Sequence, residues 1–278
     1  MIIWLDGALM PIGEARISPL DHGLVVGDGV FETLRVYDGV PFAWRRHYER
    51  LAVSAAGLGL DIPASEVLRH AADAVLDANA LREARVRVTV TGGPAPPGSS
   101  RGGAVPTAFV VATAVDAPAA RADVVVVPWS RNERGACAGL KTISYAENVR
   151  ALAFAEARGA HEAMFLNTRD ELCEATGSNV FVVRDGVART PPATSGCLLG
   201  VTRALLIVAS ESCDVAVEEA TLSLADLRDA DEAFLSSTVR EVQPIATVDG
   251  VPLRSAPGPV SERLAAAFTE LRRHDLDP

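Results

Sequence analysis

The order of strand-like and helix-like segments is the feature that most limits how this 278-residue chain can fold. Alternation of apolar and polar residues predicts strands, as in residues 85–90, where valines alternate with arginine or threonine. Apolar residues three or four positions apart predict helices over residues 44–58 and 63–79. Strands and helices of this kind follow one another along the chain without repeats, which is typical of an α+β fold.

The chain is expected to contain two domains. An alanine- and proline-rich stretch, residues 116–122, interrupts the pattern and predicts a linker between a smaller domain over residues 1–115 and a larger one over residues 123–278. A second interruption, the glycine- and proline-rich residues 92–106, predicts a long loop of the kind that is often functional.

Composition excludes several classes of protein. A formal net charge of −10 argues against binding to nucleic acid, which depends on clustered cations. No apolar run approaches the roughly 20 residues that span a bilayer, and the first residues lack the positive charge of a signal peptide. The cysteines and histidines show no metal-ligand spacing, so we expect no metal, reduced thiols and a cytoplasmic protein.

Lysine occurs only at position 141, whereas the other 25 basic residues are all arginine. Arginine serves for ion pairs, but its guanidinium stays protonated and is a poor nucleophile. Only lysine supplies a side-chain primary amine that can condense with a carbonyl group. Lys141 is therefore the first candidate for a catalytic residue, and pyridoxal 5'-phosphate (PLP) is the cofactor that such an amine suggests.

This cofactor requires a carboxylate at its ring nitrogen, and donors for its phosphate. Glu174 lies between strand-like segments and could supply the carboxylate. Residues 199–203 contain a glycine followed by amides and a hydroxyl at a predicted helix start, and Ser237 and Thr238 end a predicted strand. The spacing along the sequence allows these residues to form one site, but it does not show that they lie close together in the fold.

Several distinctive stretches follow one another in a fixed order: GDGVFETLRVYDG, HYERL, LKTISYAENV, HEAMFLN, ELCEATGSNVFVV, TPP, LLGVTR and AFLSST. Together they resemble the fold-type IV (class IV) PLP-dependent aminotransferases, and within them the D-amino-acid aminotransferase and aminodeoxychorismate lyase-like subgroup. The resemblance extends over roughly residues 3–255. It implies a two-domain α+β fold with a smaller N-terminal α/β domain and a larger, β-barrel-like C-terminal PLP-binding domain. It also implies amino acid and 2-oxo acid substrates and a homodimer.

The resemblance also assigns roles to residues. The lysine that forms the internal aldimine falls on Lys141, and the glutamate at the pyridine nitrogen falls on Glu174. Tyr145 either lies near the phenolic oxygen of the cofactor or is an ordinary packed tyrosine.

The expected phosphate-binding residues are spread along the chain. The arginine of the ERL motif falls on Arg50. The helix start after L-L-G falls on Val201 and Thr202, and the hydroxyls at the end of the late strand fall on Ser237 and Thr238.

The GDG motif resembles the D-amino-acid and lyase subgroups, so we expect a transaminase that prefers D-amino acids. Known D-amino-acid enzymes hold the substrate carboxylate with a tyrosine, here Phe31, and with an Arg-x-His pair that residues 92–106 lack. Arg35, Arg101 or Arg240 could bind the substrate carboxylate in place of the tyrosine and the Arg-x-His pair.

The alternatives are a 4-amino-4-deoxychorismate lyase, which eliminates pyruvate, a branched-chain L-amino-acid aminotransferase, and a non-catalytic binding protein of the same fold. The motif GDGVFETLRV also occurs in the lyases. The branched-chain enzymes usually read YGTSVFEGIR at this position. The candidate lysine, glutamate and arginine argue against a non-catalytic protein.

Overall fold

The structure, a computed structural model, describes residues 1–278, which divide into two compact units. The first unit contains Met1–Asp116, Leu140–Tyr145 and Asp277, and the second contains Ala117–Gly139, Ala146–Leu276 and Pro278. The Lys141 segment therefore belongs to the first unit, although it follows the predicted linker in the chain. The division into domains at residues 116–122 stays a prediction.

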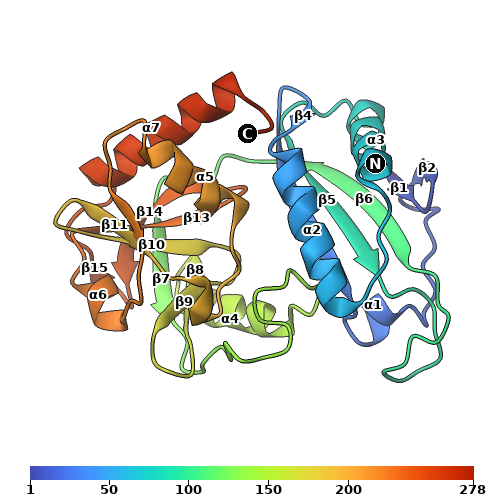
Figure 1. The fold of residues 1–278 in the computed structure, drawn as a ribbon, viewed down its shortest axis with the longest axis horizontal. Helices are drawn as coiled ribbons and strands as arrows, with labels where there is room; N and C mark the ends of the chain where they lie inside the picture. Colours follow the sequence, from blue (N-terminus) through green and yellow to red (C-terminus); the bar gives the residue numbers. More distant parts are fainter. The chain divides into compact units, whose positions relative to one another are not determined.

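The first unit is built on a six-stranded antiparallel sheet in the order β2-β1-β6-β5-β3-β4. Its strands are β1 (Ile2–Leu5), β2 (Ala8–Pro11), β3 (Gly29–Tyr37), β4 (Val40–Pro41), β5 (Ala84–Thr91) and β6 (Thr107–Ala114). Helices α2 (Trp44–Leu58) and α3 (Ser65–Ala78) pack on one face of this sheet (Figure 1), and α1 (His22–Val25) is a single turn.

Alternation along the strands separates the two faces of this sheet. Val30 of β3 lies in the core with Leu51 of α2 and Leu68 of α3, and all three side chains are buried. Because successive side chains of a strand point to opposite faces, Phe31 of β3 and Arg87 of β5 share the face without these helices.

Backbone hydrogen bonds attach the Lys141 segment to β3. The Phe31 N–H donates to the Lys141 carbonyl (3.1 Å), and the Ile143 N–H donates to the Gly29 carbonyl (2.9 Å). These bonds explain why residues 140–145 belong to the first unit.

The second unit contains a nine-stranded mixed sheet in the order β12-β11-β10-β13-β14-β7-β8-β9, with β15 paired to β14. Its strands are β7 (Ala122–Val126), β8 (Glu162–Leu166), β9 (Leu172–Ala175), β10 (Asn179–Arg184), β11 (Val187–Thr190), β12 (Val217–Glu219), β13 (Glu232–Ser237), β14 (Glu241–Val248) and β15 (Val251–Pro252). Strand β9, at one end of the order, contacts β10 near the other end, so the sheet curls like part of a barrel.

Four helices accompany this sheet. They are α4 (Ala146–Glu156), α5 (Val201–Ser210), α6 (Leu224–Arg228) and α7 (Pro259–His274). Helices α5 and α7 pack against each other (Figure 1). The buried Glu232 carboxylate accepts the N–H groups of Val260 (2.8 Å) and Ser261 (2.9 Å), which satisfies donors at the start of α7.

The predicted α+β fold is confirmed, and the predicted helix over residues 44–58 has the same bounds as α2. Strands β9 and β14 were not predicted, and Glu174, expected between strands, lies within β9. None of the helices is both long and apolar enough to cross a membrane.

Candidate active site

Lys141 lies against two aromatic rings of the first unit. Its Nζ is 4.3 Å from the centroid of the Phe31 ring and 5.9 Å from that of the Tyr145 ring. The two rings contact each other edge to face, with centroids 5.1 Å apart. The Lys141 N–H donates to Ser54 Oγ of α2 (3.0 Å), so the backbone of the lysine is held from both β3 and α2.

Arg87 reaches the same Phe31 ring, with its guanidinium carbon 3.6 Å from the ring centroid. Its Nε donates to Thr89 Oγ1 (3.2 Å), and no carboxylate pairs with it. Burial of part of the guanidinium lowers the pKa of Arg87, although the residue as a whole is exposed. Lys141 and Arg87 therefore contact the same ring, and the Arg87 cation has no carboxylate partner.

Arg87 was not predicted from the sequence. The alternation in β5 predicts only that Arg85 and Arg87 leave the core, and a solvated arginine has the same pattern. What places Arg87 next to Phe31 is the strand register, in which Phe31 pairs with Thr89 and Thr33 pairs with Arg87. The spacing of residues in the sequence does not predict that register.

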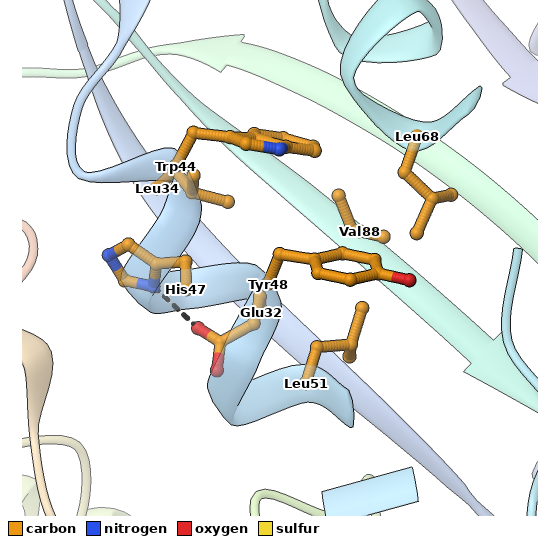
Figure 2. Close-up of a pocket in the computed structure, with 8 residues that line it drawn as sticks. All are labelled: Glu32, Leu34, Trp44, His47, Tyr48, Leu51, Leu68 and Val88. Atoms are coloured by element: carbon orange, nitrogen blue, oxygen red, sulfur yellow. Dashed lines mark hydrogen bonds and ion pairs between the residues drawn. The ribbon is translucent and has the colours of Figure 1, made fainter. Parts of the chain in front are cut away.

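A buried carboxylate of β3, Glu32, organises the arginine of the ERL motif. Glu32 accepts hydrogen bonds from Arg50 Nε (2.7 Å) and Nη2 (2.8 Å) and lies 2.7 Å from His47 Nδ1. Burial alone would raise the pKa of the Glu32 carboxyl, but Arg50 and His47 hold it well below its usual range. Figure 2 shows the carboxylate pointing toward the His47 ring, at the edge of a small cavity that Trp44 and Leu51 also line.

His47 and Arg50 lie one turn apart on α2, so the same carboxylate can contact both. Burial lowers the pKa of His47 more than the neighbouring Glu32 raises it. A neutral His47 leaves Glu32 and Arg50 as the charged pair of this cluster.

Two of the arginines proposed for a substrate carboxylate already have carboxylate partners in the first unit. Arg101 donates through Nε and Nη2 to Asp28 (2.5 Å each) and through Nη1 to the Gly59 carbonyl (2.8 Å). Arg35 pairs with the exposed Glu83 (3.1 Å). Asp28, from the GDG motif, thus ties residues 92–106 to the start of β3.

Glu174 lies in a polar cluster of the second unit. Its carboxylate accepts a hydrogen bond from Arg131 Nη1 (2.7 Å) and another from the N–H of Leu198 (2.9 Å). Arg131 also donates through Nη2 to Asn148 Oδ1 (2.9 Å), so its position is fixed on two sides. Arg131 was not predicted, because a lone arginine in an irregular stretch carries no signal.

The remaining predicted residues of the second unit lie at the start of α5 and the end of β13. Gly200 is the N-cap of α5, and Val201 and Thr202 are its first residues, both buried. Ser237 Oγ accepts the Arg240 N–H (3.2 Å), and Thr238 follows the last residue of β13.

Buried hydroxyl groups without partners mark the same region. Ser178 Oγ and Ser236 Oγ have no hydrogen-bond partner, although both residues are buried. Ser236 is paired with Asn179 across β13 and β10, next to Ser178 in the chain. A buried hydroxyl without a protein partner is able to hydrogen-bond a polar ligand or a water molecule.

Arg240, the third arginine proposed for the substrate, is part of a structural network instead. Its Nη2 lies 3.3 Å from the buried Glu162 carboxylate, and its Nη1 donates to Gln243 Oε1. Glu162 also accepts a hydrogen bond from the hydroxyl of Thr176, the residue that follows β9. The structure therefore gathers Phe31, Tyr145 and Lys141 in one unit and Glu174, Val201 and Thr202 in the other, while the proposed substrate arginines are engaged elsewhere.

Comparisons with known proteins find similarity over nearly the whole chain. The model of the family "Amino-transferase class IV" matches residues 29–248. A Methanocaldococcus jannaschii protein described as a branched-chain-amino-acid aminotransferase is 33% identical, over 98% of this chain and 96% of its own. The D-alanine aminotransferase of Listeria innocua is 32% identical, over 97% of this chain and 96% of its own. The structure of a branched-chain amino acid aminotransferase from T.th., complexed with N-(5'-phosphopyridoxyl)-L-glutamate, has a TM-score of 0.90 and 31% identity, covering 97% of this chain and 93% of that one.

Proposed function

Because the chain belongs to the class IV aminotransferases, which depend on PLP, we propose that it transfers amino groups between amino acids, D-amino acids preferred, and 2-oxo acids. The observation that carries this proposal is the contact of both Arg87 and Lys141 with the Phe31 ring. A guanidinium without a carboxylate partner is suited to bind a substrate carboxylate. In our proposal an acid bound by Arg87 lies beside the aromatic ring that also contacts the lysine amine.

The residues present fit PLP. The second unit offers the carboxylate of Glu174, helix-start amides at Val201 and Thr202, and the unpaired buried hydroxyls of Ser178 and Ser236. These groups match the ring nitrogen and the phosphate of the cofactor.

When bound, PLP supplies an electron sink that stabilises negative charge at the substrate α-carbon. In our proposal Lys141 Nζ would hold the cofactor and, once the substrate amine had replaced it there, would take up and return the proton of the substrate α-carbon. Glu174 would hold a proton at the ring nitrogen, and Arg131 fixes the position of the Glu174 carboxylate by donating to it through Nη1 (2.7 Å). Phe31 and Tyr145 give Lys141 an aromatic surface that limits its hydration.

Arg50 is proposed to bind the phosphate. The Glu32 carboxylate accepts hydrogen bonds from Nε and Nη2 of Arg50, so that the planar guanidinium is held in one orientation. Val201, Thr202 and the hydroxyls of Ser237 and Thr238 are the other proposed phosphate ligands.

The preference for D-amino acids is supported by the GDG motif and by the likeness to the Listeria innocua D-alanine aminotransferase. A second candidate is the transamination of branched-chain L-amino acids, favoured by the likeness to the Methanocaldococcus jannaschii protein and to the branched-chain enzyme solved with the phosphopyridoxyl-glutamate adduct. Phe31 and Arg87 are compatible with a carboxylate and an apolar side chain in either case.

A spectroscopic half-reaction screen tests the proposal. The purified enzyme with PLP is mixed with D-alanine, D-glutamate, L-leucine or L-valine, and conversion of the cofactor to its amino form is followed by absorbance. Conversion by the D-amino acids supports the proposal, while conversion by only L-leucine or L-valine supports the second candidate. Pyruvate release from aminodeoxychorismate without transamination would identify a lyase instead, and Lys141→Ala serves as the blank.

We further propose that the enzyme works as a homodimer in the cytoplasm. Its four cysteines are all unpaired, as expected in a reducing compartment. Light scattering coupled to size exclusion tests the dimer, and a monomeric mass would contradict it.

A further inference from the structure

The backbone of Leu198 connects two groups that we assign to opposite ends of the cofactor. Its N–H donates to Glu174 Oε2 (2.9 Å), and its carbonyl accepts from Asn179 Nδ2 (2.7 Å). Two residues later Gly200 caps α5, whose first turn is the proposed phosphate site. Leu198 is therefore the link between the carboxylate and the helix start.

Asn179 is rigidly placed. It is the first residue of β10, it is 6% exposed, and its backbone pairs with Ser236 of β13. A Cβ atom at Gly200 would lie 2.1 Å from Asn179 Oδ1, so the side-chain amide packs directly against the N-cap of α5. One amide group thus holds Leu198 on one side and contacts Gly200 on the other.

PLP is a rigid ring with its nitrogen and its phosphate group at fixed positions. A site that binds both must hold the carboxylate and the phosphate-binding amides at one separation, since small misplacements weaken such contacts strongly. We propose that Asn179 is a positioning residue that sets, through Leu198, the separation between Glu174 and the start of α5. This inference rests on the roles that the proposed function gives to Glu174 and α5.

The test compares PLP with pyridoxal, which lacks the phosphate. Full-length Asn179→Ala and the nearly isosteric Asn179→Asp are freed of cofactor and titrated with each compound. If Asn179 sets the separation, the Kd for PLP rises by about tenfold or more, whereas the Kd for pyridoxal changes by less than about twofold. Release of PLP from the loaded enzyme accelerates correspondingly.

Asn79 provides the matched control in the first unit. Its Nδ2 donates to the carbonyls of Ile2 and Val75 (2.7 Å each), so Asn79→Ala also removes an amide that ties backbone segments together. We expect Asn79→Ala to lower the melting temperature without changing the Kd for PLP. This control separates a general loss of stability from a change in spacing.

An unchanged Kd for PLP in both Asn179 variants would overturn the inference, as would an equal loss of affinity for PLP and pyridoxal. Should one variant fail to fold, the other still decides the question. If the wild-type protein binds no PLP, the proposed function fails first, and this result is distinct from a wild-type protein that binds PLP while the variants bind it equally well.

Discussion

Replacing Glu32 by glutamine should destabilise the protein far more than an ordinary ion-pair substitution. Glu32 is 1% exposed and pairs with both Arg50 and His47. Removing one partner of a buried pair costs about 3–5 kcal/mol. Glutamine keeps one acceptor, and the Arg50 side chain is 15% exposed. We therefore expect Glu32→Gln to lower the free energy of unfolding by about 3 kcal/mol, at the low end of that range.

Urea unfolding of the cofactor-free protein at neutral pH measures this loss. Glu83→Gln is the matched control, because Glu83 also pairs with an arginine, Arg35 (3.1 Å), but is 57% exposed. An exposed pair contributes only about 1 kcal/mol or less. A loss for Glu32→Gln that equals the loss for Glu83→Gln would refute the argument that burial decides the cost.

The effect of pH on the stability of the same variant follows from the direction in which folding shifts the pKa of Glu32. The pKa of Glu32 is lower in the folded protein than its usual value of 4.5. A carboxyl of this kind stabilises the folded state fully above the unfolded pKa, and the contribution is lost as the pH falls below it. The stability difference between the wild type and Glu32→Gln should therefore be largest at neutral pH and narrow below about pH 4.5.

Three further substitutions test the proposed chemistry. Lys141→Ala should lower turnover by more than about 100-fold, because it removes the amine proposed to carry the proton, and a wild-type rate would exclude that role. Glu174→Gln should lower kcat while PLP still binds, as judged by the absorbance of the protein, and an unchanged kcat would argue against a role at the ring nitrogen. Arg87→Gln should lower kcat/KM by about tenfold or more through the loss of a charged hydrogen bond, whereas Arg85→Gln, on the same strand but hydrogen-bonded to Thr113, should leave it unchanged.

Much of the fold could be predicted because its elements have clear periodicity. Helix α2 and strand β5 each bury one face, so their apolar residues recur at intervals of three to four or of two. Strand β9 was missed because all four of its residues are buried, which removes the alternation. Strand β14 contains Pro244, which usually argues against an interior strand. It is tolerated because β14 pairs with β13 up to Pro244 and with β7 only from Ile245 onward.

The candidate site was predictable only in part, for a different physical reason. Lys141 and Glu174 were found because their residue types suit particular chemistry. Arg87 and Arg131 are identified by what they contact, and these contacts depend on strand register and loop conformation rather than on residue type. Arg101 and Arg240 were nominated as cations, but hydrogen bonds to Asp28 and Gln243 occupy them.

The attachment of Lys141 to β3 has a consequence for how such an enzyme can change over evolution. The bond from the Phe31 N–H to the Lys141 carbonyl joins backbone atoms and is independent of the side chain at position 31. Exchanging Phe31 for another residue can therefore reshape the surface beside the amine while leaving the backbone of Lys141 in place. Position 31 is accordingly a good first target for directed evolution of a new substrate range, since mutations there need not be matched by compensating changes around the lysine.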